Sequence, residues 1–93
     1  MNYPNPCEIR VSENIHIEVD VKKDDCKREA PHCHVYVSGM RRLQVWLDSV
    51  TFSSDPRPFL NKSDENSVLA AVSANKYKLI EAYNHNRIYG AGY

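Results

Sequence analysis

Apolar and polar residues alternate strictly along the stretch from Ile15 to Val21. A period of two is typical of a half-buried β-strand, because successive side chains point to opposite faces of a sheet. The run Cys7–Val11 before it predicts a short partner strand, and the polar residues 12–14 predict the turn between the two. This part of the chain therefore predicts a β-hairpin whose apolar side chains face one way.

A second alternating run, 32–37, follows a charged loop at 22–30 and Pro31. Its sequence, HCHVYV, predicts a strand with one apolar and one polar face. The apolar face carries Cys33, Val35 and Val37, and the polar face carries His32, His34 and Tyr36. We expect the apolar face to pack on the core, so that both histidines look outward from it.

The pattern then predicts a tight turn at 38–40 and a further strand at 42–48, whose Leu and Val positions face inward. Residues 50–53 either extend this strand or add another short one. From 53 to 63 two prolines and several turn formers predict a loop, since proline cannot donate a hydrogen bond to a central strand.

The hydrophobic period changes in the last third of the chain. Between Ser63 and about Asn86 apolar residues recur at roughly helical spacing. Ser63 is a suitable N-cap, and the acidic residues after it suit the positive end of the helix dipole. The weak helix formers at 73–75 leave open two shorter helices with a kink, and residues 87–93 predict a flexible tail.

These elements predict an α+β fold: a small antiparallel β-sheet of three to four strands with one face covered by a C-terminal α-helix. A chain of 93 residues supports one compact core, so residues 1–93 are expected to form a single domain.

Composition narrows the classes of function. Lys and Arg number 12 and Asp and Glu number 12, which counts against a long nucleic-acid track that works by neutralising phosphates but leaves a small local nucleic-acid patch open. No apolar run reaches the length of a membrane helix, and the N-terminal residues lack the pattern of a signal peptide. We therefore expect a cytoplasmic protein without membrane contact. Its three cysteines are then expected to be thiols.

The polar face of the 32–37 strand is the main candidate site. His32 and His34 are two residues apart on one strand, so they project from the same face about 6–7 Å apart. If this strand pairs antiparallel with 15–21, the polar side chains of that neighbour join them. The cluster would then hold His16, Glu18, Asp20, His32, His34 and Tyr36.

Three interpretations of this cluster stay open. The first is a divalent metal site, such as a zinc site, because imidazole and carboxylate are common ligands. Its candidate ligands are His32, His34, His16, Glu18 and Asp20, and Cys26 lies in the preceding loop.

The second interpretation is acid–base catalysis by His32 and His34 with Tyr36, as in a metal-free ribonuclease, where Arg41 and Arg42 supply positive charge for a phosphate. The third is purely structural, because solvent-facing sheet surfaces often carry such residues. In every case Cys33 is expected to be a small core residue.

A contact surface is the remaining candidate. Trp46 lies on the polar face of its strand with Arg42, and with Tyr36 these residues form a candidate partner-binding set. The alternative for Trp46 is packing against the chain termini.

The segment APHCHVYV at 30–37 resembles the Pro-His-Phe-His signature of a family of small bacterial and phage proteins of unknown function. Pro31, His32 and His34 match the signature, and Cys33 replaces its Phe. The helical segment 74–84 is also similar to the family's C-terminal helix. The similarity spans about residues 15–86, whereas the long charged loop at 22–30 and the proline-rich loop at 54–62 depart from the family pattern.

Members of that family are often encoded as small paired genes and grouped with toxin–antitoxin-like modules. The resemblance implies a binding or regulatory component of such a pair, acting on a protein partner or as a homo-oligomer through the face bearing His32 and His34. The alternative is a nuclease-like or metal-dependent hydrolytic enzyme that uses the same two histidines.

Overall fold

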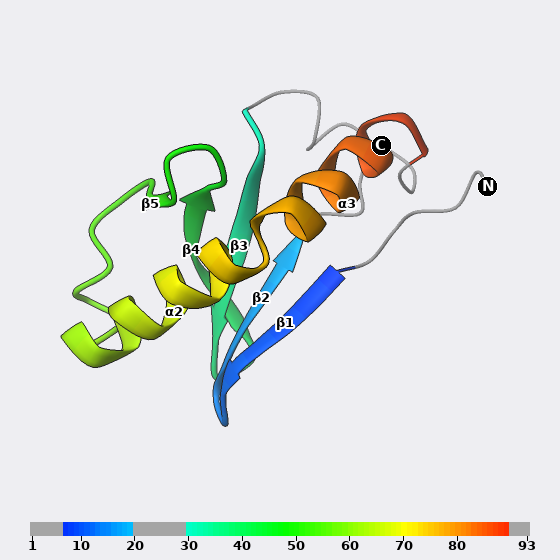
Figure 1. The fold of residues 1–93 in the computed structure, drawn as a ribbon. Coiled ribbons are helices and arrows are strands. Elements are labelled where there is room, and N and C mark those ends of the chain that lie inside the picture. Colours follow the sequence, from blue (N-terminus) through cyan, green and yellow to red (C-terminus); the bar gives the residue numbers. More distant parts are fainter. Residues whose placement is uncertain (1–6, 20–29, 90–93) are drawn as a thin grey trace.

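The computed structural model describes residues 7–19 and 30–89. They form an antiparallel sheet of five strands in sequence order, with two helices lying across one of its faces (Figure 1). The strands are β1 (Cys7–Ser12), β2 (Ile15–Val19), β3 (His32–Val37), β4 (Met40–Trp46) and β5 (Thr51–Phe52). The helices are α2 (Lys62–Ala74) and α3 (Lys76–Tyr89). The predicted α+β class is confirmed, with a slightly higher strand count than expected.

Strands that follow one another in the chain are neighbours in the sheet, because each connection that the structure describes is a short turn. Ser38 and Gly39 join β3 to β4 with φ angles of 52° and 82°. Two successive positive φ values are typical of the two-residue hairpin turn whose twist matches that of the strands. The turn predicted at 38–40 is therefore confirmed, and it sets the register by pairing Val37 with Met40.

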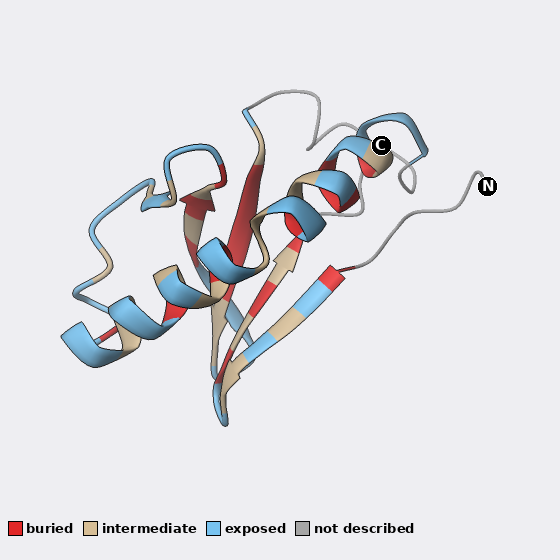
Figure 2. Cartoon of the chain, in the orientation of Figure 1, coloured by how far each residue is buried: buried red, intermediate tan, exposed pale blue. Residues whose placement is uncertain are grey.

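The core lies between the sheet and the helices. Figure 2 shows buried positions on β2, β3 and β4 and along both helices. The inward residues predicted from the alternation are confirmed wherever the structure describes them. They include Ile15, Ile17, Val19, Cys33, Val35, Leu43, Val45 and Leu47, which pack with Val68, Val72, Leu79 and Tyr83 of the helices.

The helical region differs from the expectation at its start and in its middle. Asn61, rather than Ser63, is the N-cap of α2, and its side-chain oxygen accepts a bond of 2.8 Å from the Asp64 amide. The interruption left open at 73–75 is present. Asn75 ends α2, where both its backbone and its side-chain nitrogen donate to the Ala71 carbonyl. Because α3 then continues to Tyr89, the helix extends beyond the predicted end near Asn86.

Within residues 7–19 and 30–89 no helix is both long enough and apolar enough to cross a membrane. Residues 20–29, which include Asp20, Cys26 and most of the predicted charged loop, lie outside the described residues, and so do residues 90–93 of the predicted tail.

Candidate functional site

The polar side chains of β1 to β4 gather on the sheet face opposite the helices, which we call the polar face. Antiparallel pairing places His16 of β2 opposite Tyr36 of β3, and Glu18 opposite His34. The pairing predicted between 15–21 and 32–37 is therefore confirmed over the described residues. On the other side of β2, Glu8 of β1 lies opposite Glu18. Four residues of two predicted strands and one residue of the edge strand thus share one surface.

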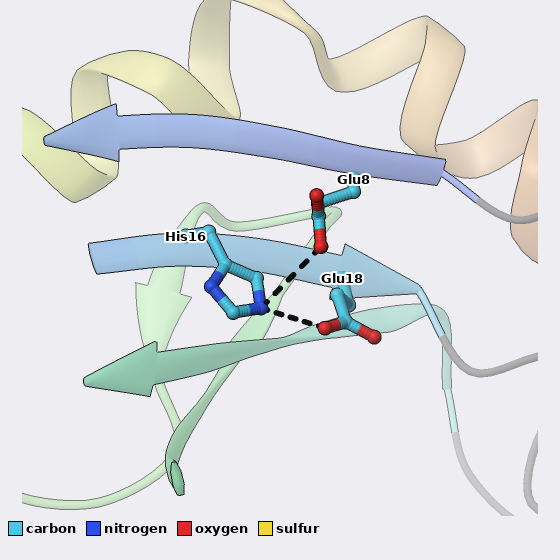
Figure 3. A group of neighbouring side chains, drawn as sticks. All are labelled: Glu8, His16 and Glu18. Atoms are coloured by element: carbon cyan, nitrogen blue, oxygen red, sulfur yellow. Dashed lines mark hydrogen bonds and ion pairs between the residues drawn. The ribbon is translucent and has the colours of Figure 1, made fainter. Parts of the chain in front are cut away.

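His16 is the centre of this surface. Its Nε2 lies 2.6 Å from Glu18 Oε2 and 3.6 Å from Glu8 Oε1, so two carboxylates converge on one imidazole nitrogen (Figure 3). The His16 side chain is 15% exposed, whereas those of Glu8 and Glu18 are 60% and 39% exposed. The imidazole is thus held within the sheet surface, while both carboxylates remain open to solvent.

Tyr36 links His16 to a cation on β4. Its ring stacks on the His16 ring with centroids 4.7 Å apart and planes inclined by 9°. Arg41 Nε donates a bond of 3.2 Å to the Tyr36 hydroxyl, and the Arg41 guanidinium carbon lies 5.7 Å from the ring centroid. A row of touching groups therefore crosses the sheet from the carboxylates through imidazole and phenol to a guanidinium. We call Glu8, Glu18, His16, Tyr36 and Arg41 the cross-sheet row.

A slip in the strand register brings Arg41 into this row. The tight turn sets Tyr36 opposite Arg41, but Val35 lies opposite Leu43, which leaves Arg42 as an extra residue in β4. Such a β-bulge redirects side chains without ending the strand. Arg41 consequently reaches Tyr36, while Arg42 retains the face of Gln44, and both arginines line the same hollow.

This hollow lies beside the cross-sheet row. Its volume is about 300 Å³, and its walls come from β3, β4 and the segment after β5. The lining residues are His34, Arg41, Arg42, Leu43, Gln44, Ser53 and Ser54. Except for Leu43, every one of them carries a side-chain hydrogen-bond donor or an imidazole.

The prediction that both histidines of the 32–37 strand look outward is wrong for His32. Its side chain is only 1% exposed, and its ring lies edge-on to Tyr83 of the core, with centroids 5.3 Å apart. His32 Nδ1 donates a bond of 2.8 Å to the Ala30 carbonyl, since a carbonyl oxygen can only accept. His34 is also buried, at 7% exposure, but it lines the hollow. The two histidines therefore have different surroundings, although alternation assigns them to one face.

The structure brings only some of the predicted metal ligands together. Among the described residues, Glu8, His16 and Glu18 form the group of three ligand atoms within 4.8 Å of one another. Ligand bonds of about 2.0–2.2 Å to a shared zinc ion separate neighbouring ligand atoms by roughly 3–3.5 Å. His16 Nε2 lies 2.6 Å from Glu18 and 3.6 Å from Glu8, so the side chains would have to shift to hold one ion. His32 and His34 stand edge to face, with ring centroids 5.0 Å apart, and belong to no such group. Asp20 lies outside the described residues.

The partner-binding set is likewise only partly assembled. Trp46 lies opposite His32 in the β3–β4 pair and is half-buried, with its ring 5.9 Å from the His32 ring and edge-on to it. Arg42 is exposed, donates to the Met40 sulfur and covers the Phe59 ring at 5.3 Å. Tyr36 belongs to the cross-sheet row. Trp46 thus lies against His32, whereas Arg42 lies against Met40 and Phe59, away from that pair.

Cys7 and Cys33 are buried free thiols, as the sequence predicts for these two. Burial, with a smaller contribution from the nearby Cys7, raises the pKa of Cys33 to about 12. Because a thiol with so high a pKa stays protonated at neutral pH, Cys33 is unsuited to act as a nucleophile. It serves as a core residue.

Sequence reasoning missed Glu8, Ser53 and Ser54 as candidate site residues. Glu8 had a usable signal, because it occupies a polar position of the expected Cys7–Val11 strand and a hairpin places it beside Glu18. Ser53 and Ser54 had none, since their position depends on how the loop after β5 returns to β4.

Comparison with protein-family models, with curated proteins and with solved structures found no match to this chain. The resemblance carried by Pro31, His32 and His34 therefore remains a prediction from the motif.

Proposed function

We propose that the protein binds a protein partner through its polar face, as the binding or regulatory component of a toxin–antitoxin-like pair. The observation that supports this proposal best is the cross-sheet row. It presents two exposed carboxylates at β1 and β2 and exposed guanidinium groups at β4, on the sheet face opposite the helices. The paired-gene context is implied by the family resemblance, whereas the expected cytoplasmic location comes from the sequence pattern, in which no apolar run reaches the length of a membrane helix.

The charge separation indicates what the partner offers. A surface with carboxylates on one side and arginines on the other favours a partner that carries the opposite order of charges, because complementary potentials fix orientation and speed association. Beside the arginines, Met40 and Phe59 are 56% and 41% exposed. Arginine, methionine and aromatic residues are enriched at protein interfaces, so this end of the face supplies apolar contact area as well.

Calorimetric titration with the protein encoded beside it tests the proposal. Tyr36→Ala and Arg41→Ala each remove a central member of the cross-sheet row and should weaken binding by about tenfold or more, as interface anchors do. Tyr77→Ala is the matched control, since Tyr77 is 86% exposed on α3. Equal loss in Tyr77→Ala, or full affinity in both row variants, would contradict the proposal. Self-association of the chain alone, lost in the same variants, would instead make the partner a second copy.

A metal-dependent hydrolytic enzyme is a second candidate, favoured by the convergence of Glu8, His16 and Glu18. One imidazole and two carboxylates suit zinc or manganese, and such an ion lowers the pKa of bound water to about 7. In this version of the alternative His16 replaces His32, whose ring is enclosed. His34, which lines the hollow, stays available as an acid–base group.

Elemental analysis of untagged protein tests this candidate. Stoichiometric metal that disappears in both Glu8→Gln and His16→Gln, but persists in His85→Gln on α3, would support it. Metal that persists without Glu8 and His16, or protein that takes up no added zinc or manganese, would refute it.

A further inference from the structure

The hollow between β4 and the segment after β5 has a composition that the partner-binding proposal does not explain. Two guanidinium groups, an amide and two hydroxyls line it together with His34, and no carboxylate is among its lining residues. Arg41, Arg42, Gln44, Ser53 and Ser54 can all direct hydrogen-bond donors toward one guest. A wall so rich in donors suits a ligand that is rich in acceptors.

Arg42 is placed to bind an anion. Its guanidinium donates to the Met40 sulfur, which is a weak acceptor, and packs over the Phe59 ring. In the described part of the chain it forms no ion pair with a carboxylate. A charged group held by weak contacts at the wall of a hollow retains most of its capacity for charge-assisted hydrogen bonds.

The backbone fixes the two sides of the hollow relative to each other. The Ser53 amide donates a bond of 2.8 Å to the Gln44 carbonyl, which ties the serine segment to β4. On β4 itself, the register slip brings consecutive arginines to the same hollow. Regular alternation would place Arg41 and Arg42 on opposite faces of the sheet. The bulge therefore creates the arginine pair.

We infer that this hollow binds a phosphate monoester group. A phosphate offers three terminal oxygens and up to two negative charges, so it can use two guanidinium forks and a hydroxyl at once, whereas a carboxylate is satisfied by one fork. The volume of about 300 Å³ lies at the small end of ligand pockets, and it accommodates a phosphate together with part of the group that carries it. The inference is independent of the protein partner, because it concerns a ligand of the isolated chain.

Calorimetric titration of the full chain, purified in phosphate-free buffer, tests this inference with inorganic phosphate, O-phosphoserine and a nucleoside monophosphate as probes. We expect saturable binding at about 1 mM or tighter for at least one probe. Arg42→Gln and Arg41→Gln should each weaken it by about tenfold, as the loss of a charge-assisted pair predicts. Arg42→Lys, which retains the charge but loses the fork, should weaken it less.

Arg57→Gln is the matched control, because Arg57 is an exposed arginine near the same loop whose guanidinium is bound to Asp55 rather than directed to the hollow. It should leave binding unchanged. The probe that binds most tightly identifies the source of the phosphate group. Absence of saturable binding for all three probes, or equal weakening by Arg57→Gln, would overturn the inference. If the unmodified protein binds phosphate but does not bind the partner protein, the proposed function alone is refuted.

Discussion

The two faces of the sheet come from the same strands, one residue alternating with the next, yet they are held together differently. On the helix side, Ile17, Val35 and Val45 are fully buried among aliphatic and aromatic side chains from α2 and α3. On the polar face, contacts are directional and run between individual polar groups, such as Glu18 to His16 and Arg41 to Tyr36. We therefore expect the helix side to carry most of the stability of the domain, whereas the polar face is the surface that we propose for partner binding.

His32 is the exception that marks the boundary between these faces. Alternation assigns it to the polar side, but its ring packs on Tyr83 and it is as buried as the core residues. Its stability contribution should therefore resemble that of the helix side, and separate replacement of His32 and of His16 tests this.

The largest effect is expected at Tyr83 of α3, which is fully buried in the core. Tyr83→Ala removes a large side chain from a packed interior and should lower the free energy of unfolding by about 3–5 kcal/mol. Tyr77→Ala, on the exposed side of the same helix, should change it by less than about 0.5 kcal/mol. Chemical denaturation measures both. Similar values for the two variants would contradict the assignment of stability to the helix side.

A smaller difference is expected between two histidines. His32→Ala removes buried ring contacts and the bond to Ala30, so it should destabilise the fold by about 1–3 kcal/mol. His16→Ala removes contacts to two carboxylates whose side chains are 60% and 39% exposed, and it should cost less than about 1 kcal/mol. Denaturation midpoints of the two variants measure this difference in stability. A larger loss for His16 would mean that the polar face supports the fold after all.

The third prediction concerns Cys33 and the pH dependence of stability. Since burial raises its folded-state pKa from 9.0 to about 12, its contribution to stability is complete below pH 9 and is lost as pH rises toward 12. The slope should be about 1.4 kcal/mol per pH unit at most. Cys33→Val, which retains an apolar side chain, should flatten the decline in unfolding free energy between pH 9 and pH 11. An unchanged slope in this variant would show that other groups cause the decline.

The strands and their inward residues were predictable because alternation is a local property. The pairing of Ile15–Val19 with His32–Val37 also followed from the pattern. The register slip at Arg42 did not, since it arises when a two-residue turn at Ser38 and Gly39 fixes one register and the core fixes another. The burial of His32 depends on Tyr83, which lies far away in sequence. The strand pairing could thus be inferred from the local pattern. The bulge that shapes the site could not.

Hydroxyl-radical footprinting of the complex with the partner protein tests the central claim most directly, because it reports solvent access side chain by side chain. We predict that Tyr36 and Met40 lose reactivity when the partner binds, while Tyr77 and Ile88, which are exposed on α3, retain it. Protection of Tyr77 and Ile88 with unchanged reactivity at Tyr36 and Met40 would place the interface on the helices and contradict the assignment of binding to the polar face.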